Sequence, residues 1–222
     1  MADSPASGSR PIALEVWSDV ACPFCYIGKR SLEAALDRFE HRDDVSVVWR
    51  SFQLDPSAPV EPAGDMYDML AAKFGGSRED ARAKTENVVA MAAQSGLTYD
   101  MDAARPSNTF DAHRMIHLAA SLDRQDAMNE RLLAAYFTEG AVLADHGTLR
   151  RLAVEVGLPA ERVEAVLAGD EFADAVRHES QEAQQLGLGG VPAFVFDRRG
   201  AVAGAQPPEV LLSALEQLHA AA

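Results

Sequence analysis

The only two cysteines in this chain of 222 residues, Cys22 and Cys25, lie at the junction of a predicted strand and a predicted helix. Apolar residues alternate through Ile12–Ser18, a pattern that predicts a buried strand, and recur at helical spacing through Pro23–Phe39. Proline suits the first helical position because its missing N–H group would have no partner there. We therefore expect Cys22 at a helix start, where unpaired N–H groups and the helix dipole favour a negatively charged thiolate.

Two thiols at this spacing can close into a small disulfide ring and open it again, which makes redox chemistry the favoured interpretation. Structural zinc is a weaker alternative because it needs four ligands, and the sequence holds no second cysteine pair. A purely structural disulfide is also weaker, because so short a loop constrains the unfolded chain little. Within the ring, Pro23 and Phe24 are expected to influence the stability of the thiolate.

The charge and hydropathy of the chain argue against several classes of partner. With 34 acidic residues against 20 basic ones and a net charge of −14, no nucleic-acid partner is expected. No apolar run approaches the length of a membrane span, so we expect no membrane segment. Residues 1–10 are polar and lack the apolar stretch of a signal peptide, which predicts a disordered tail and a cytoplasmic protein. Thiols are kept reduced in the cytoplasm, which favours a catalytic pair over a structural one.

The predicted strands lie near the two ends of the chain. Val45–Leu54 is rich in β-branched and aromatic residues and predicts a second strand after the first helix. The connection between these two strands is long enough for a right-handed parallel crossover. Near the other end, Ala193–Asp197 and Ala201–Ala205 flank a turn and predict a hairpin, and Pro207–Ala220 predicts a closing amphipathic helix.

A long helical block separates these two ends. Asp55–Ala63 is rich in proline and predicts a linker, and the pattern from Gly64 to Leu186 is helical, with glycines between the helices. The predicted helices are Asp65–Phe74, Ser77–Ser95, Asn108–Leu122, Gln125–Glu139, Thr148–Val156, Pro159–Ala168 and Glu171–Leu186. Because strands lie on both sides of the block, the chain must leave the sheet and return to it.

The segment from Gly189 to Pro192 precedes the first strand of the hairpin. A peptide bond before proline adopts the cis form at low cost, and the neighbouring glycines resemble a turn. A cis bond would leave the Val191 backbone extended and free to pair with an incoming cysteine peptide. An ordinary trans proline at the start of a strand is the alternative that the residues themselves leave open.

Two histidines, His113 and His117, lie four positions apart on one predicted helix. This spacing can bind a metal, but the segment lacks the glutamate of a His-Glu-x-x-His motif and no third ligand is evident. We therefore expect no metal there. Ser107 or Asn108 is predicted to cap the start of this helix.

Several segments together resemble a thioredoxin fold of the DsbA type, and more narrowly its FrnE-like branch. The residues that carry the resemblance are Trp17 to Gly28, Ser107-Asn108-Thr109 with Ala112-His113-Arg114, Gly190-Val191-Pro192, and Gly204-Ala205-Gln206-Pro207. The resemblance implies an α/β, thioredoxin-like fold of the order β-α-β … β-β-α with a large all-helical insertion. The thioredoxin-like domain would comprise residues 11–62 and 187–222, and the helical insertion domain residues 63–186.

The resemblance also implies a thiol–disulfide oxidoreductase or isomerase, with Cys22 as nucleophile and Cys25 as resolving thiol. Its substrates would be cysteine-containing proteins or peptides, glutathione is a candidate partner, and no cofactor is expected. The residues predicted to contact substrate are Val191, Pro192, Pro23, Phe24 and His113. The helical block is expected to pack beside an exposed Cys22 sulfur, with His113 at the cleft wall. The direction of the reaction, the physiological substrate and the choice between monomer and homodimer are not encoded in these patterns.

Two other classes of function stay open. The same superfamily includes kappa-class glutathione transferases and 2-hydroxychromene-2-carboxylate isomerases, in which a serine takes the place of the first cysteine. Both cysteines are present here, which favours redox chemistry. A chaperone-like module that holds unfolded peptides would instead keep its activity in a Cys22→Ser variant.

Overall fold

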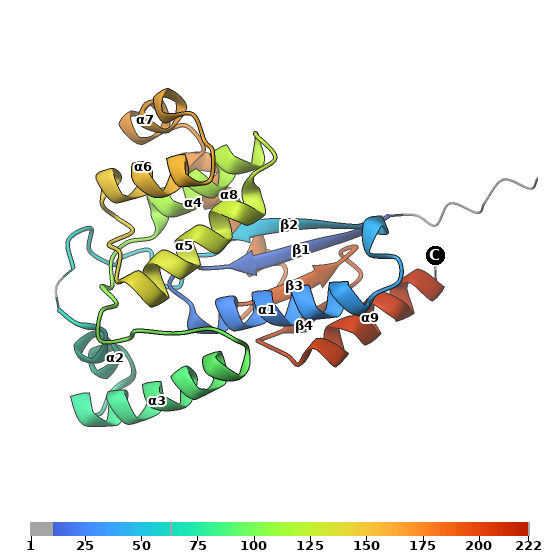
Figure 1. The fold of residues 1–222 in the computed structure, drawn as a ribbon, viewed down its shortest axis with the longest axis horizontal. Helices are drawn as coiled ribbons and strands as arrows, with labels where there is room; N and C mark the ends of the chain where they lie inside the picture. Colours follow the sequence, from blue (N-terminus) through green and yellow to red (C-terminus); the bar gives the residue numbers. More distant parts are fainter. Residues whose placement is uncertain (1–10, 63, 222) are drawn as a thin grey trace, which may run out of the picture.

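The computed structural model describes residues 11–62 and 64–221, which fold around a four-stranded mixed sheet (Figure 1). The strands are β1 (Ile12–Ser18), β2 (Val45–Ser51), β3 (Ala193–Phe196) and β4 (Gly200–Ala203), in the spatial order β2-β1-β3-β4. β2 runs parallel to β1, whereas β3 pairs antiparallel with both β1 and β4. The two ends of the chain therefore build one sheet, as predicted. The tail predicted at residues 1–10 lies outside the described residues.

Helix α1 (Pro23–Arg38) follows β1 and returns the chain to β2 through a 3₁₀ turn at Arg42–Asp44. Helix α9 (Pro208–Ala220) lies beside α1 and also contacts β1 (Figure 1). The apolar stripe of α1, which includes Ile27 and Leu32, is buried. This packing fixes the first turn of α1 next to the carboxyl end of β1.

The chain between β2 and β3 is helical, as the sequence predicts. Its helices are α2 (Met66–Phe74), α3 (Arg78–Gln94), α4 (Phe110–Ala120), α5 (Gln125–Glu139), α6 (His146–Glu155), α7 (Ala160–Ala168) and α8 (Ala173–Gln185). Helix α2 pairs with α3, while α4 packs against α5, α6, α7 and α8. The division into two domains stays a prediction, and α3 and α5 contact α1 directly. Among the residues that the structure describes, no helix is both long and apolar enough to cross a membrane.

At two of the predicted boundaries that differ from the observed ones, side chains take over backbone hydrogen bonds. β2 ends at Ser51 rather than Leu54, and the Leu54 N–H donates to the carboxylate of Asp19 instead of to a strand. Helix α4 is preceded by Thr109 as its N-cap, not by Ser107 or Asn108. The Asn108 side chain still accepts a hydrogen bond from the N–H of Phe110, so it closes the turn just before the helix.

An ion-pair network attaches α8 to the sheet. Glu179 is only 6 % exposed, and its carboxylate accepts hydrogen bonds from the Arg50 guanidinium at 2.8 Å and from the Ser51 N–H at 2.7 Å. His117 lies 3.1 Å from the same carboxylate. Burial raises the pKa of Glu179, but these donors outweigh it and lower the pKa to about 2.

Replacing Glu179 by glutamine removes this charge at nearly constant volume. Because the folded-state pKa of about 2 lies below the ordinary 4.5, the carboxylate stabilises the fold fully above pH 4.5 and loses that effect as the pH falls toward 2. We expect Glu179→Gln to lower the free energy of unfolding at pH 7 by about 2–3 kcal/mol, measured by urea denaturation. The difference from wild type should shrink between pH 4.5 and pH 2.

The control is Glu171→Gln, which removes an exposed ion pair with Arg162. It should change the unfolding free energy by less than about 0.5 kcal/mol. Equal losses in the two variants would contradict a special role of the α8 network.

Candidate active site

Cys22 is the N-cap of α1, at the point where the chain turns from β1 into the helix. Its backbone is extended, Pro23 holds the first helical position, and the thiol makes no capping hydrogen bond. The Cys22 N–H donates to the Asp19 carbonyl and the Cys25 N–H donates to the Cys22 carbonyl, each at 3.0 Å. Cys22 is only 3 % exposed, less open than expected, whereas Phe24 is 37 % exposed. The predicted contact of Phe24 with substrate stays a prediction.

Cys25 lies one helical turn behind Cys22 and has no exposed surface. Both thiols are free. Burial raises the pKa of Cys25 well above its ordinary value, and the hydrogen bond and charge of Cys22 raise it further. The Ser18 side chain and the Asp19 backbone lower the Cys25 pKa, but they do not outweigh the burial. The pair thus consists of a front thiol at the helix start and a protected thiol behind it.

The loop before β3 faces the front thiol. The Val191–Pro192 peptide bond is cis, which confirms the predicted geometry. The Cys22 thiol donates to the Val191 carbonyl at 3.5 Å, and the Pro192 carbonyl accepts from the Gly204 N–H at 2.8 Å. The structure therefore brings together residues that lie 169 positions apart in the sequence.

Gly28 makes room for this loop. A Cβ atom at this position would lie 2.9 Å from Cγ of Pro192 and 3.2 Å from Cζ of Phe194, closer than packed carbons normally approach. A glycine inside a helix lowers its stability, which predicts a close approach to the sheet at Gly28, and this approach is observed. The residue nearest to Gly28 is Pro192, the proline of the loop that faces Cys22.

A residue of the helical block holds the first turn of α1. Tyr99, in the loop after α3, donates its hydroxyl hydrogen to the Pro23 carbonyl at 2.7 Å. Its ring stacks on Phe137 at 4.7 Å and on Tyr26 at 6.1 Å between centroids. Burial raises the pKa of Tyr99, and the nearby charge of Cys22 raises it further, so this hydroxyl remains a hydrogen-bond donor.

The predicted position of His113 on a cleft wall is wrong. His113 is 1 % exposed, and its Nε2 lies 3.4 Å from a carboxylate oxygen of Asp19, which is also buried. The Asp19 carboxylate in turn accepts from the N–H groups of Ala21 and Leu54. The face of α4 that carries His113 is turned into the core, so this side chain supports the loop before Cys22 and does not face a substrate.

A groove of about 410 Å³ opens beside Ala21, the residue before Cys22. Met69 and Ala72 of α2 contribute to its apolar lining, and Tyr136 and Ser107 border it. The Ser107 hydroxyl is buried and has no hydrogen-bond partner among the described residues. The groove can accommodate an apolar segment, and the Ser107 hydroxyl offers that segment a polar contact.

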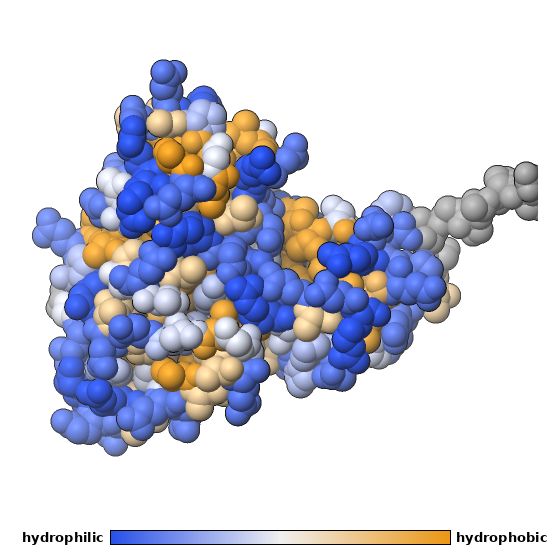
Figure 2. All heavy atoms as spheres, viewed as in Figure 1, coloured by the Kyte–Doolittle hydropathy of each residue, from blue (hydrophilic) through white to orange (hydrophobic). Residues whose placement is uncertain are grey.

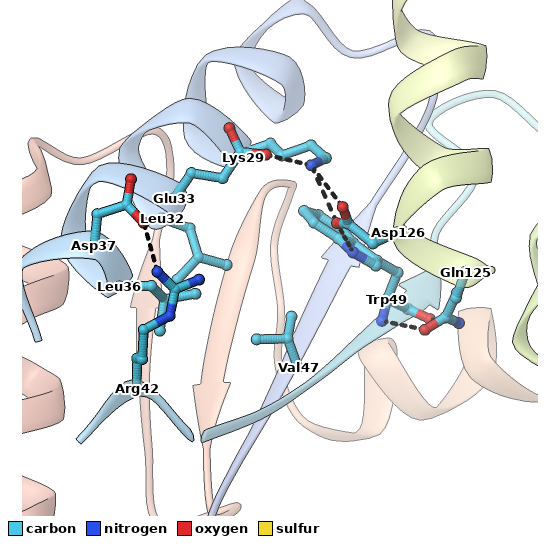
Figure 3. A pocket seen from close by; sticks show the side chains of 10 residues that line it. All are labelled: Lys29, Leu32, Glu33, Leu36, Asp37, Arg42, Val47, Trp49, Gln125 and Asp126. Carbon is cyan, nitrogen blue, oxygen red and sulfur yellow. Dashed lines mark hydrogen bonds and ion pairs between the residues drawn. The ribbon is translucent and has the colours of Figure 1, made fainter. Parts of the chain in front are cut away.

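A second cavity, of about 350 Å³, lies between α1, β2 and the start of α5, away from both cysteines (Figure 3). An apolar patch marks this region over the strands in Figure 2. Lys29 points toward Asp126 here, and it also pairs with Glu33 and Glu130. Burial lowers the pKa of Lys29, but the three carboxylates raise it above its ordinary value. This lysine is a paired structural cation and not a reactive amine.

Three residues near the sulfurs carry little signal in the sequence. Ser18 and Asp19 lie four and three positions before Cys22, where a buried strand ends, and their polar character there is the only local signal. Tyr99 lies 76 positions from Pro23 in a segment without a motif, and only the folded structure reveals their contact.

Comparison with known proteins agrees with this geometry. Residues 13–216 match the family described as the DSBA-like thioredoxin domain. The probable DsbA oxidoreductase SCO1869 from Streptomyces coelicolor is 46 % identical, covers 93 % of this chain and 89 % of its own, and has a TM-score of 0.88. The chain belongs to the family of DsbA-like thioredoxin domains. The narrower FrnE-like assignment stays a prediction.

More distant structures share the fold. The cytosolic disulfide reductase DsbM from Pseudomonas aeruginosa is 21 % identical over 95 % of this chain and 100 % of its own, with a TM-score of 0.65, and a structure of it with GSH also matches. A 2-hydroxychromene-2-carboxylate isomerase is 15 % identical over 93 % of this chain and 95 % of its own, with a TM-score of 0.68. One fold therefore occurs in proteins named for different activities.

Alkylation rates should separate the two thiols. We expect iodoacetamide to modify Cys22 first at every pH, because Cys25 is fully buried and its raised pKa keeps it protonated. Mass spectrometry after timed quenching gives both rates. The Cys22→Ser variant is the control, since burial still raises the pKa of Cys25 there and slow alkylation should persist. Alkylation of Cys25 as fast as that of Cys22 in the native protein would contradict the assignment.

Gly28→Ala should disturb the contact between α1 and the active-site loop. The new methyl group collides with the rings of Pro192 and Phe194, and this overpacking outweighs the better helix propensity of alanine. We expect a net loss of about 1 kcal/mol or more in unfolding free energy, together with slower reaction of Cys22 with a disulfide. Gly189→Ala is the control, because a Cβ there meets no atom within 4 Å. Equal behaviour of the two variants would refute the role of this contact.

Proposed function

We propose that this protein is a thiol–disulfide oxidoreductase or isomerase that acts through Cys22 and Cys25. The observation that carries the proposal is the position of the Cys22 sulfur, at the start of α1 and 3.5 Å from the Val191 carbonyl, with a free Cys25 one turn behind. A front thiol next to an extended backbone can receive a cysteine peptide, and a second thiol within reach can release it. Membership in the family of DsbA-like thioredoxin domains supports the same chemistry.

In the reducing direction, the Cys22 thiolate attacks one sulfur of a substrate disulfide. A bond forms between Cys22 and that sulfur, and the other substrate sulfur leaves as a thiolate that takes up a proton. Cys25 then loses its proton and attacks the Cys22 sulfur, which releases the second substrate thiol and leaves a Cys22–Cys25 disulfide. The substrate gains two electrons and two protons from the pair. The same steps in reverse oxidise a dithiol.

The surroundings of Cys25 support this sequence of steps. In the reduced protein, burial and the neighbouring Cys22 sulfur both raise the pKa of Cys25, which keeps it from competing for substrate. Once Cys22 is part of a mixed disulfide, its sulfur carries no negative charge. It therefore no longer raises the Cys25 pKa through its charge or as a thiolate hydrogen-bond acceptor. The Ser18 side chain and the Asp19 backbone, which lower the Cys25 pKa, remain in place. Formation of the mixed disulfide thus removes the causes by which Cys22 raises the Cys25 pKa, while the effect of burial remains.

We further propose that the substrates are cysteine-containing proteins or peptides and that the protein works in the cytoplasm. The apolar groove beside Ala21 and the exposed Phe24 ring support binding of a peptide segment. The name of the structurally similar DsbM describes that protein as a cytosolic disulfide reductase. Val191 and Pro192 would bind the backbone of the substrate, and Pro23 and Phe24 would line its path.

Reduction of insulin with dithiothreitol tests the proposal. The wild-type protein should accelerate the appearance of turbidity, and Cys22→Ser should abolish the acceleration. Cys25→Ser should trap a mixed disulfide with a cysteine peptide, visible as an added mass on Cys22. Ser213→Ala, on α9, removes a hydroxyl whose hydrogen bond is with Gln217 of the same helix; it is the control and should retain full activity. Acceleration that survives in Cys22→Ser would refute the redox role.

A glutathione-dependent transferase or isomerase is the second candidate. The fold is shared with a 2-hydroxychromene-2-carboxylate isomerase and with a GSH-bound disulfide reductase. This alternative predicts a saturable glutathione site without disulfide reductase activity. Isothermal titration of the Cys22→Ser variant with reduced glutathione, combined with the insulin assay, distinguishes the two.

A further inference from the structure

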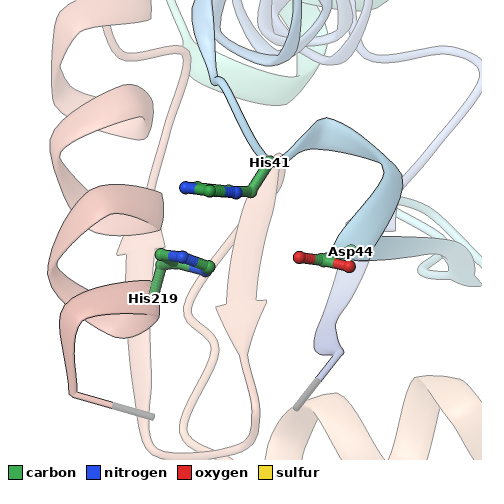
Figure 4. A group of neighbouring side chains, drawn as sticks. All are labelled: His41, Asp44 and His219. Atoms are coloured by element: carbon green, nitrogen blue, oxygen red, sulfur yellow. The ribbon is translucent and has the colours of Figure 1, made fainter. Parts of the chain in front are cut away.

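A cluster of metal-ligating side chains lies at the far end of α1 from the cysteines (Figure 4). His41 follows α1, Asp44 ends the 3₁₀ turn that leads into β2, and His219 lies in the last turn of α9. One ligand atom from each residue lies within 4.8 Å of the other two. Since the 16 residues of α1 rise about 24 Å, this cluster is separate from the Cys22 site.

The two imidazole rings are already held together. They stack with centroids 3.8 Å apart and planes 15° apart. The ring of Phe39 contacts both of them edge-on, at 5.8 Å from His41 and 5.9 Å from His219. Nδ1 of His219 is buried and has no hydrogen-bond partner among the described residues. A buried ring nitrogen without a partner is unusual and indicates a ligand that would satisfy it.

We propose that His41, Asp44 and His219 bind one zinc ion. Two imidazole nitrogens and one carboxylate oxygen form a donor set that zinc uses in proteins, with water in the fourth position. Imidazole ligands favour transition metals over Mg²⁺ and Ca²⁺, and the net charge of −14 attracts cations in general. Zinc–nitrogen bonds of about 2.0–2.1 Å require the ligand atoms to move closer together, so the stacked rings turn as the site closes on the ion.

The ion would join segments that are distant in the sequence. His41 and Asp44 belong to the connection between α1 and β2, whereas His219 belongs to α9, which packs against α1 and is joined to it by the Arg38–Glu209 ion pair. A zinc ion there attaches the last turn of the closing helix to the sheet. The role is stabilisation of the fold, independent of the thiol chemistry.

Isothermal titration with zinc chloride tests the proposal. The protein is the full chain without a histidine tag, with both cysteines changed to serine because thiols also bind zinc. We expect one zinc ion per chain and at least a tenfold loss of affinity in His219→Gln and in His41→Gln. The control is His178→Gln, an exposed histidine on α8, which should bind zinc as the parent does.

Thermal unfolding provides the second measurement. Binding to the native state alone raises the melting temperature, so saturating zinc should raise that of the parent by about 5 °C or more and leave that of His219→Gln unchanged. His41 is exposed, so His41→Gln provides the same test if the His219 variant does not fold. Absence of stoichiometric binding, or equal binding by the parent and the His41 variant, would overturn the proposal.

Discussion

The packing of Gly28 against the Pro192 ring is the contact on which the candidate active site depends. With no side chain at this position, α1 approaches the loop closely enough for the Cys22 thiol to reach the Val191 carbonyl. Strand pairing also restricts the position of this loop, because Pro192 directly precedes β3, and β3 pairs with β1. The packing of α1 and the pairing of β3 are therefore two separate constraints, and together they place the Cys22 sulfur next to the Val191 carbonyl.

The helical block supports the same end of α1 from the other side. Tyr99 reaches the Pro23 carbonyl, and the Tyr26 hydroxyl donates to Glu130 of α5 at 2.6 Å. The carboxylate of Asp19 lies 3.4 Å from Nε2 of His113 and accepts from the Ala21 N–H in the turn before the cysteines. Residues between β2 and β3 thus form partly buried hydrogen bonds with the first turn of α1. The groove beside Ala21 is a further result of this contact between block and sheet.

Local patterns in the sequence predict most of the fold. The strand before the cysteines and the helix start at Pro23 depend on residues within a few positions of one another, and a glycine inside that helix already indicates a close approach at Gly28. The burial of His113 and the contact of Tyr99 depend on how a long block folds back onto α1. Helical periodicity shows that α4 has an apolar face, but it does not show which neighbour that face meets. The missed features are therefore long-range ones.

The hydrogen bond from the Cys22 thiol to Val191 makes the binding loop sensitive to the state of the sulfur. When Cys22 is a thiol, it donates to the Val191 carbonyl, which is then unavailable to the backbone N–H of a substrate. A sulfur in a disulfide has no hydrogen to donate. The Val191 carbonyl is therefore vacant when Cys22 is in a disulfide or is a thiolate, and only the protonated thiol covers it. Access to this backbone acceptor is in this way coupled to the protonation and oxidation state of the Cys22 sulfur.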